Sequence, residues 1–290
     1  MTILVTGANG QLGREMVLAL QADGEPCIAI GRKELDFSRP DQVADTIAGY
    51  AADWVVNCAA YTQVDKAEEE RELAFTVNRD AARAVAKGVK CSDGRLLHVS
   101  TDFIFGGDSS YPYKEDDTTN PLGVYGQSKL EGEQAVREVL PEALILRTAW
   151  VYGVHGHNFV KTMLRLAAER DELRVVDDQI GTPSWTGDIV KAMRALVKEN
   201  ASGTFQFTNE GVTSWYDFAV EIVAGAKQAG FPVIAETIRP IPTKDFPLPA
   251  KRPAYSVLSK EKIRHVLDYP IPHWRESLHA MLESEKEATK

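Results

Sequence analysis

The sequence predicts an α/β protein with a doubly wound parallel sheet and a smaller carboxyl-terminal substrate lobe. Over the first half of the chain, short β-branched runs alternate with amphipathic stretches of helical length. A glycine-rich turn follows the first of these runs directly. Alternation of this kind is typical of parallel strands covered by helices on both faces.

The predicted elements of the first half follow one another in regular order. Apolar residues recur at helical spacing in the longer stretches, with polar faces opposite. The strands are expected at residues 2–6, 27–30, 54–57, 96–100 and 144–147, and the helices at residues 11–22, 41–51, 70–87 and 125–139.

Composition narrows the class of protein further. The chain has 290 residues, of which 44% are hydrophobic and 26% charged, as in ordinary globular proteins. Its net charge of -9 comes without a cluster of Lys and Arg, which argues against a nucleic-acid partner. Cys27, Cys58 and Cys91 lack metal-type spacing and are expected to be reduced thiols. We expect no membrane association and a cytoplasmic location, because neither a signal segment nor a long apolar run occurs.

The first turn, Gly7-Ala8-Asn9-Gly10-Gln11-Leu12-Gly13, lies between a predicted strand and a predicted helix. This is the context of a dinucleotide-binding fingerprint of the Rossmann type, although the spacing is Gly-x-x-Gly-x-x-Gly. Glycines let the backbone approach a pyrophosphate, which the helix amino terminus attracts. A turn without a ligand is the alternative.

The end of the second predicted strand bears on the choice of coenzyme. NAD-specific sites usually place an acid there, whereas this chain has Gly31-Arg32-Lys33. The two cations, Arg32 and Lys33, favour binding of a 2′-phosphate and hence of NADPH. The alternative is that both are solvent-exposed loop residues that contact no ligand. NADH stays open as an alternative coenzyme. Asp36 and Phe37 are placed beside the adenine, and the small residues Ala59 and Ala60 leave room for the coenzyme after the third strand.

The candidate catalytic residues follow the fourth strand. Tyr125 and Lys129 are one helical turn apart, so we expect the ammonium to lower the pKa of the phenol. A phenol of this kind protonates a carbonyl oxygen during reduction. Thr101 ends a strand at the edge where ligands bind and can hydrogen-bond the same carbonyl. Asn78, on the preceding helix, is expected to complete a proton relay or to be an ordinary polar helix position.

Together these residues resemble the extended short-chain dehydrogenase/reductase superfamily and, within it, the dTDP-4-dehydrorhamnose reductase family. The family resemblance covers nearly the whole chain and includes segments 64–68, 100–105, 147–153, 158–163 and 178–183 and the closing residues Arg252, Pro253 and Ser256.

The resemblance implies reduction by NADPH of the carbon-4 ketone of dTDP-4-dehydro-L-rhamnose, the last step of dTDP-L-rhamnose biosynthesis, with the proton supplied by Tyr125. Carried over by position, the substrate is bound by Thr101, Asp102, Tyr125, Trp150 and Arg252, and the coenzyme by Gly10, Gln11, Leu12, Asp36, Phe37, Ala60, Tyr61, Thr62 and Lys129. Residues 1–150 are then an NADPH-binding Rossmann domain. Residues 151–290 are mainly a substrate-binding lobe, interleaved with the last strands of the sheet.

The second half is predicted less completely. Helices are expected at residues 159–168, 189–198 and 215–229, and the proline-rich residues 240–253 as an extended loop. A homodimer is one possible state of the protein, since the apolar faces of the predicted helices could pack in the core or form an interface between subunits. Some members of the family depend on magnesium, and Glu68-Glu69-Glu70 is either a contributor to such a site or a solvated helix start.

Other functions on the same fold stay open at this point. Dehydratases of the superfamily usually carry Glu after the Thr-Asp pair, where this chain has Phe103, which cannot act as a base. Epimerases retain NAD between half-reactions and tend to be longer. Another nucleotide-sugar reductase is a further alternative. A non-catalytic regulator similar to the regulatory subunit of methionine adenosyltransferase is disfavoured by Thr101, Tyr125 and Lys129.

Overall fold

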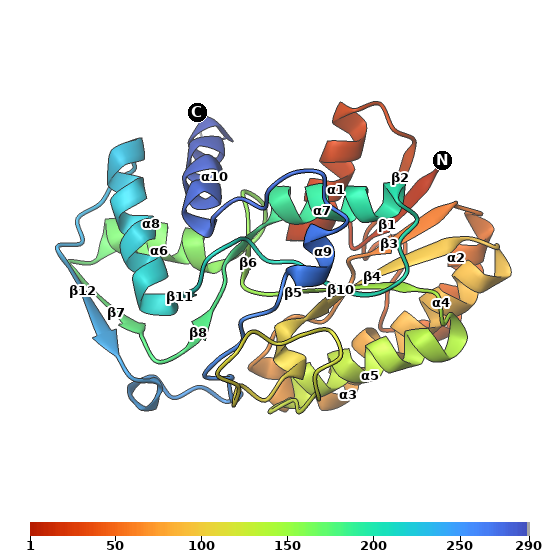
Figure 1. Ribbon diagram of the computed structural model, residues 1–290, viewed down its shortest axis with the longest axis horizontal. Coiled ribbons are helices and arrows are strands. Elements are labelled where there is room, and N and C mark those ends of the chain that lie inside the picture. The colour runs from red at the N-terminus through yellow and green to blue at the C-terminus, as the bar shows by residue number, and fades with distance from the viewer. Residues whose placement is uncertain (289–290) are drawn as a thin grey trace.

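A parallel sheet of six strands forms the centre of the computed structural model, which describes residues 1–288 (Figure 1). The expected α/β fold with a doubly wound sheet is confirmed. In the order β10-β5-β4-β3-β1-β2, the strands are β10 (Gly203–Gln206), β5 (Leu144–Thr148), β4 (Arg95–Thr101), β3 (Trp54–Asn57), β1 (Ile3–Thr6) and β2 (Cys27–Ile30).

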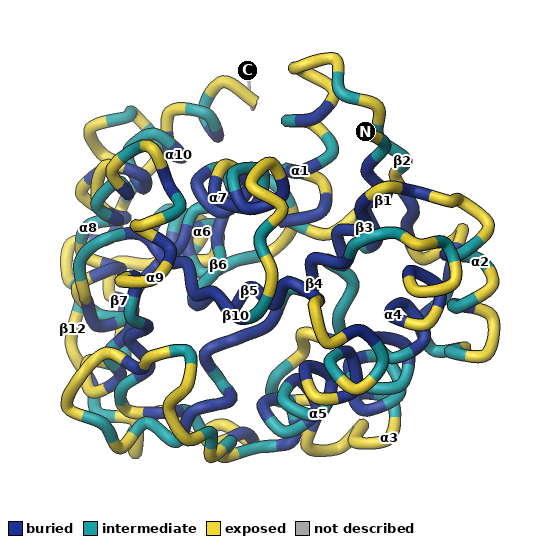
Figure 2. Tube along the Cα trace, turned by 45° about the vertical axis from the view of Figure 1, so that its right-hand side comes forward, coloured by how far each residue is buried: buried dark blue, intermediate teal, exposed yellow. Residues whose placement is uncertain are grey.

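Helices cover both faces of this sheet (Figure 1). On one face, α1 (Gln11–Ala22) packs against α7 (Thr186–Lys198), and their apolar residues share a core with Ile3, Val5 and Leu97. On the other face lie α2 (Val43–Gly49), α4 (Ala81–Cys91) and α5 (Val124–Val139). Figure 2 shows the inner strands β1, β3, β4 and β5 as a mostly buried layer between exposed outer segments, whereas β2 at the sheet edge is partly exposed.

The single helix expected at residues 70–87 is interrupted. It consists of α3 (Arg71–Phe75), a π-helical turn at Thr76–Asp80, and α4. Asn78 lies in this turn and is buried. Apolar spacing identified the helix but not the turn, because π turns inside helices arise from local contacts and often occur at functional sites.

The second half builds a lobe with its own apolar core, centred on Tyr152, Phe218 and Trp274. Its helices are α6 (Phe159–Glu169), α8 (Trp215–Ala229) and α10 (Trp274–Ala288), whereas α9 (Glu261–Arg264) contacts β10 and joins the core of the central sheet through Ile263. Its paired strands are β7 (Glu172–Val176) with β12 (Thr237–Ile241), β6 (Val151–Tyr152) with β9 (Ser184–Trp185), and β8 (Ile180–Gly181) with β11 (Thr213–Ser214).

Two expectations for this half need correction. The helix predicted from residue 189 begins at Thr186, and residues 240–253 are not wholly an extended loop. Pro240 and Ile241 end β12, and Thr243–Asp245 forms a 3₁₀ turn. Proline is tolerated because β12 pairs only with β7 and therefore lies at a sheet edge.

The two regions are interleaved in space. Strand β10 and helix α7 come from the second half of the sequence, yet β10 completes the central sheet and α7 covers it. The division after residue 150 stays a prediction, and its last two residues, 289 and 290, lie outside the described part. Within residues 1–288, every helix is too short or too polar to cross a membrane.

Candidate active site

The glycine turn is shaped for a close approach of backbone to ligand. Gly7 has φ +64°, and a Cβ atom there would lie 2.7 Å from the backbone nitrogen of Ala59. A Cβ atom on Gly13 would lie 2.3 Å from the Gly7 carbonyl oxygen. Gly10 begins α1 without a side-chain cap from the described residues, so the first N–H groups of this helix are available to an anion. These features fit the pyrophosphate of a dinucleotide.

Gln11 joins this turn to the second half of the chain. Its Oε1 accepts a hydrogen bond of 2.9 Å from Asn158, which also donates to the Gly153 carbonyl. Leu12 is buried in the core between α1 and the sheet. The side chains of both residues are thus engaged within the protein, and their contribution to a ligand falls to the backbone.

A cavity of about 380 Å³ adjoins the turn at the end of β2. Its lining includes Asn9, Arg14, Gly31 and Glu34. The Glu34 carboxylate accepts a hydrogen bond of 2.8 Å from the Gly31 backbone nitrogen. An acid therefore reaches the strand end where the sequence shows only glycine, because the chain turns back after residue 31. Neither Arg14 nor Glu34 was among the predicted residues.

Arg32, the residue predicted to contact a 2′-phosphate, extends into solvent in this structure. The Arg32 side chain is 82% exposed and lies 3.7 Å from Asp36 in an ion pair. The Ser38 backbone N–H lowers the pKa of Asp36, so this carboxylate holds a turn. Phe37 is buried in the core between the sheet and α4. Roles for these residues toward a coenzyme stay predictions.

Asn78 connects the segment after β3 to the catalytic helix. Its Oδ1 accepts from the Tyr61 backbone nitrogen at 2.8 Å, and its Nδ2 donates to the Tyr61 carbonyl and to Ser128 Oγ. These contacts use both N–H donors of the amide and give Asn78 a positioning role, and its part in a proton relay stays a prediction. Of the predicted neighbours of Tyr61, Ala59 and Ala60 are half-buried and Thr62 is exposed.

Thr101 and Tyr125 lie close together, as expected. Thr101 ends β4, and its hydroxyl donates to Asp102 Oδ1 at 3.0 Å and accepts from the Phe103 backbone nitrogen. Tyr125 lies in the first turn of α5, with its ring edge-on to Phe103 at 5.5 Å between centroids. The site therefore joins a strand end to a helix start.

The expected lowering of the Tyr125 pKa is wrong for this structure. Burial raises it to about 12, and the nearby Thr101 hydroxyl offsets only part of that rise. Lys129 instead donates a hydrogen bond of 2.7 Å from Nζ to the Val99 carbonyl. Burial lowers the pKa of Lys129 to about 8, against the opposing charge of Glu133. Desolvation outweighs the effect of the neighbouring charge, since Lys129 is buried and Tyr125 is half-buried.

Asp102 is a buried carboxyl group at the site. It is 2% exposed, and among the described residues its Oδ2 has no hydrogen-bond partner. Burial raises its pKa to about 6, although the Ser256 and Thr101 hydroxyls lower it in part. An unpartnered carboxylate oxygen beside a phenol is a ready acceptor for a substrate hydroxyl.

Trp150 lies where the two halves of the chain meet. Its backbone has φ +45°, which is costly for a side chain of this size and is found mainly at functional sites. Its indole stacks on Trp215 with centroids 3.5 Å apart, and Gly181 leaves room against its edge. Trp215, which was not predicted, thus fixes the orientation of the predicted sugar-packing residue.

Arg252 forms a two-pronged ion pair with Asp65. Its Nη1 and Nη2 donate to the two carboxylate oxygens at 3.1 and 2.8 Å. This contact lowers the pKa of Asp65. The expected substrate-binding role of Arg252 stays a prediction, and in this structure the guanidinium fastens the closing segment to the segment after β3.

The acidic run after Asp65 is not only a solvated helix start. Glu68 accepts from the Val124 backbone nitrogen at 2.9 Å, and Glu70 accepts from the Tyr61 hydroxyl at 2.6 Å. Within residues 1–288, no three His, Cys, Asp or Glu side chains come together as a metal site would require. The magnesium expectation therefore finds no support in the structure.

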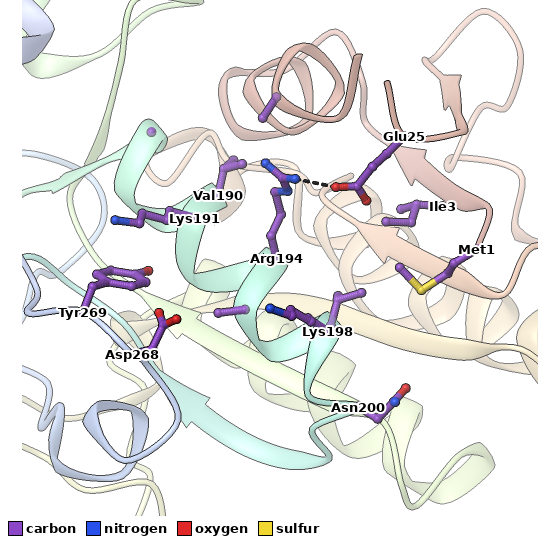
Figure 3. A pocket seen from close by; sticks show the side chains of 14 residues that line it. Met1, Ile3, Glu25, Val190, Lys191, Arg194, Lys198, Asn200, Asp268 and Tyr269 are labelled. Carbon is purple, nitrogen blue, oxygen red and sulfur yellow. Dashed lines mark hydrogen bonds and ion pairs between the residues drawn. The ribbon is translucent and has the colours of Figure 1, made fainter. Parts of the chain in front are cut away.

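A larger cavity, of about 610 Å³, lies elsewhere (Figure 3). It is lined by residues of α1 and α7 and by Met1, Asp268 and Tyr269. Arg194 pairs there with Glu25, and Lys191 lies over the Tyr269 ring at 3.6 Å (Figure 3). None of the predicted site residues lines this cavity. The volume of a cavity is therefore not a guide to the catalytic site in this protein.

The parallel sheet, the glycine turn after β1 and the arrangement of Thr101, Tyr125 and Lys129 define an oxidoreductase with a Rossmann-type fold. The family model described as the RmlD substrate binding domain matches residues 1–287. The chain belongs to this family.

Individual relatives agree with this assignment. A dTDP-4-dehydrorhamnose reductase from Burkholderia thailandensis is 43% identical over 95% of this chain and 96% of its own length. The crystal structure of such a reductase from Clostridium acetobutylicum superposes with a TM-score of 0.92 at 39% identity, covering 99% and 100% of the two chains. The Bacillus anthracis enzyme in complex with NADP gives a TM-score of 0.92 at 36% identity, covering 98% and 99%.

Proposed function

We propose that this protein is an NADPH-dependent oxidoreductase that reduces the carbon-4 ketone of dTDP-4-dehydro-L-rhamnose to give dTDP-L-rhamnose. The reaction completes dTDP-L-rhamnose biosynthesis and serves polysaccharide biosynthesis. The observation that carries this proposal is the meeting of Thr101 and Tyr125 at the end of β4, in a chain 43% identical to a reductase of that name.

Tyr125 supplies the proton in the proposed reaction. With a pKa raised to about 12, the phenol is protonated at neutral pH and can donate to a ketone oxygen as negative charge develops there. The single proton of the Thr101 hydroxyl, which Asp102 Oδ1 accepts in this structure, would turn to the same ketone oxygen as a second hydrogen bond. The nicotinamide, when bound, supplies the hydride that forms the new C–H bond. Lys129 Nζ donates to the Val99 carbonyl and would hold the nicotinamide ribose with its remaining N–H donors.

The same proposal assigns the remaining residues. Asp102, Trp150 and Arg252 contact the substrate, and the coenzyme contacts are Gly7, Gly10, Gln11, Leu12, Gly13, Arg32, Asp36, Phe37, Ala59, Ala60, Tyr61, Thr62, Tyr125 and Lys129. A homodimer and the division of the chain after residue 150 are further parts of it.

Coenzyme choice depends on opposing charges in the cavity beside β2. Arg14 lines this cavity, whereas Arg32 and Lys33 lie in the exposed turn beyond Gly31. All three cations favour a 2′-phosphate. Glu34 opposes them, because its carboxylate lies on the Gly31 backbone nitrogen, where an acid would accept from a 2′-hydroxyl. We therefore propose NADPH as the main coenzyme, with NADH accepted.

The residues at the site bear on two of the competing functions, a dehydratase and a non-catalytic regulator. A dehydratase requires a base beside the ketone, and Phe103 fills that position with its ring against Tyr125. A regulatory protein has no need of the Thr101–Tyr125 pair. These observations favour reduction.

The decisive experiment follows NADPH oxidation with dTDP-4-dehydro-L-rhamnose and identifies the product by NMR. Tyr125→Phe should lower turnover by at least about a hundredfold, because it removes the proton donor while retaining the ring. Binding of NADPH should be nearly unchanged in that variant, which separates proton donation from coenzyme binding. Turnover close to that of the wild type would refute the role of Tyr125. No consumption of NADPH by the wild type would refute the function.

A further inference from the structure

The start of helix α5 depends on a distant residue. Gly123 precedes the helix in an extended conformation, φ -145° and ψ 173°, and supplies no side-chain cap of its own. The Val124 backbone N–H donates instead to Glu68 Oε1 at 2.9 Å, across 56 positions of sequence. A Cβ atom on Gly123 would lie 2.6 Å from that oxygen, so the carboxylate occupies the space that a side chain there would need.

The residue after Val124 is Tyr125, and the first turn of a helix is where unsatisfied N–H groups accumulate. A carboxylate at this end satisfies one of them and also interacts favourably with the helix dipole. Loss of that contact would let the first turn fray, and the phenol would move with it.

Neighbouring carboxylates of the same segment hold other parts of the site. Asp65 pairs with Arg252 of the closing segment, and Glu70 accepts from the hydroxyl of Tyr61, two residues after Ala59, whose backbone lies against Gly7. Glu69 forms no side-chain hydrogen bond or ion pair within residues 1–288 and is exposed. The three engaged carboxylates therefore fasten three different elements around one short segment.

We propose that Glu68 is a positioning residue that fixes Tyr125 for proton transfer by capping α5 from outside the helix. The proposal rests on the proposed reductase function. Catalysis by an oriented group is sensitive to displacement, and a shift of about 1 Å can cost about a hundredfold in rate. Glu68 itself does not contact the ketone, so its effect should appear in kcat and leave coenzyme affinity nearly unchanged.

The test compares Glu68→Ala with the matched control Glu69→Ala, which removes an adjacent exposed carboxylate. Glu68→Ala should lower kcat by about ten- to a hundredfold, with the NADPH dissociation constant within about twofold of wild type. Glu68→Gln keeps an acceptor oxygen and should retain most of the activity. Equal kcat values in Glu68→Ala and Glu69→Ala would overturn the proposal.

A rescue variant distinguishes capping from a general loss of structure. In the Glu68→Ala background the space beside residue 123 is free, and the backbone of Gly123 is compatible with a capping serine. Adding Gly123→Ser should therefore restore kcat to within about threefold of wild type. No recovery in a variant that folds, as judged by circular dichroism, would overturn the proposal.

Hydrogen exchange gives a readout that requires no substrate. The amides of Val124 and Gln127, which donate to Glu68 and to the Gly123 carbonyl, should lose protection in Glu68→Ala and keep it in Glu69→Ala, and the Gln127 amide should regain it in the rescue variant. Unchanged protection in Glu68→Ala would overturn the proposal even if the enzyme were active. A wild-type protein that does not reduce the sugar would instead overturn the proposed function, and exchange would still decide whether Glu68 caps α5.

Discussion

Replacing Asp102 by Asn tests the electrostatics of the site without a substrate. Burial raises the pKa of this carboxyl from 3.8 to about 6. Between these values the folded protein binds a proton that the unfolded chain does not, so folding stability falls as pH rises through the window. Above about pH 6 the loss is complete and amounts to about 3 kcal/mol. The amide keeps the acceptor for the Thr101 hydroxyl but carries no charge.

The variant should therefore be more stable than the wild type by up to about 3 kcal/mol near pH 8, and the gain should vanish near pH 4. Urea unfolding followed by tryptophan fluorescence measures the difference across this range. Asp116→Asn, which changes an exposed carboxylate, is the matched control and should show little change. A gain that does not depend on pH, or a loss of stability near pH 8, would refute the reasoning.

Two further predictions concern the coenzyme. Because burial lowers the pKa of Lys129 to about 8, its ammonium is charged below that pH and neutral above it. The NADPH dissociation constant should rise between about pH 7 and pH 9 in a fluorescence titration and should be nearly flat in Lys129→Met. Constant wild-type affinity over this range would contradict the assignment. Glu34→Gln should raise the ratio of NADPH to NADH catalytic efficiencies by about tenfold, since it removes a negative charge near the expected 2′-phosphate. Equal effects on both coenzymes would show that Glu34 lies outside the ribose site.

Local sequence was sufficient for most of the central fold. The strands at Cys27–Ile30 and Trp54–Asn57 and the helix at Gln11–Ala22 begin and end where the pattern placed them. Each is a short apolar or amphipathic segment bounded by turn residues, so its limits are set by its own residues. Strand β10, Gly203–Gln206, carries no such pattern, because it is a strand only through its pairing with β5.

The closeness of Thr101 and Tyr125 could be predicted, whereas the partners of the site residues could not. Thr101 ends a parallel strand. The carboxyl ends of parallel strands lie at the same edge of the sheet, whatever path the connecting segments take. The hydrogen bond from Val124 to Glu68 and the ion pair between Arg252 and Asp65 join residues 56 and 187 positions apart. No spacing rule relates such residues, and only the folded arrangement brings them together.

Electrostatic predictions fail for a related physical reason. The interaction of Lys129 with Tyr125 follows from helix geometry, which the sequence provides, but the removal of water depends on every neighbouring element. In the structure burial displaces the pKa of Tyr125 upward and that of Lys129 downward, and it raises that of Asp102. All three shifts favour the neutral form of the group.

This common direction bears on how the proposed reaction proceeds. A substrate ketone is neutral when it binds, and negative charge appears on its oxygen only during reduction. A phenol that keeps its proton until that moment stabilises the transition state more than the bound ketone, which is the condition for raising turnover. Ligands can add hydrogen bonds at two places in this site. The Asp102 Oδ2 atom has no partner among the described residues, and Lys129 Nζ donates only to a backbone carbonyl. The high pKa of Tyr125 is thus compatible with general-acid catalysis, provided that Thr101 and the start of α5 hold the phenol in place.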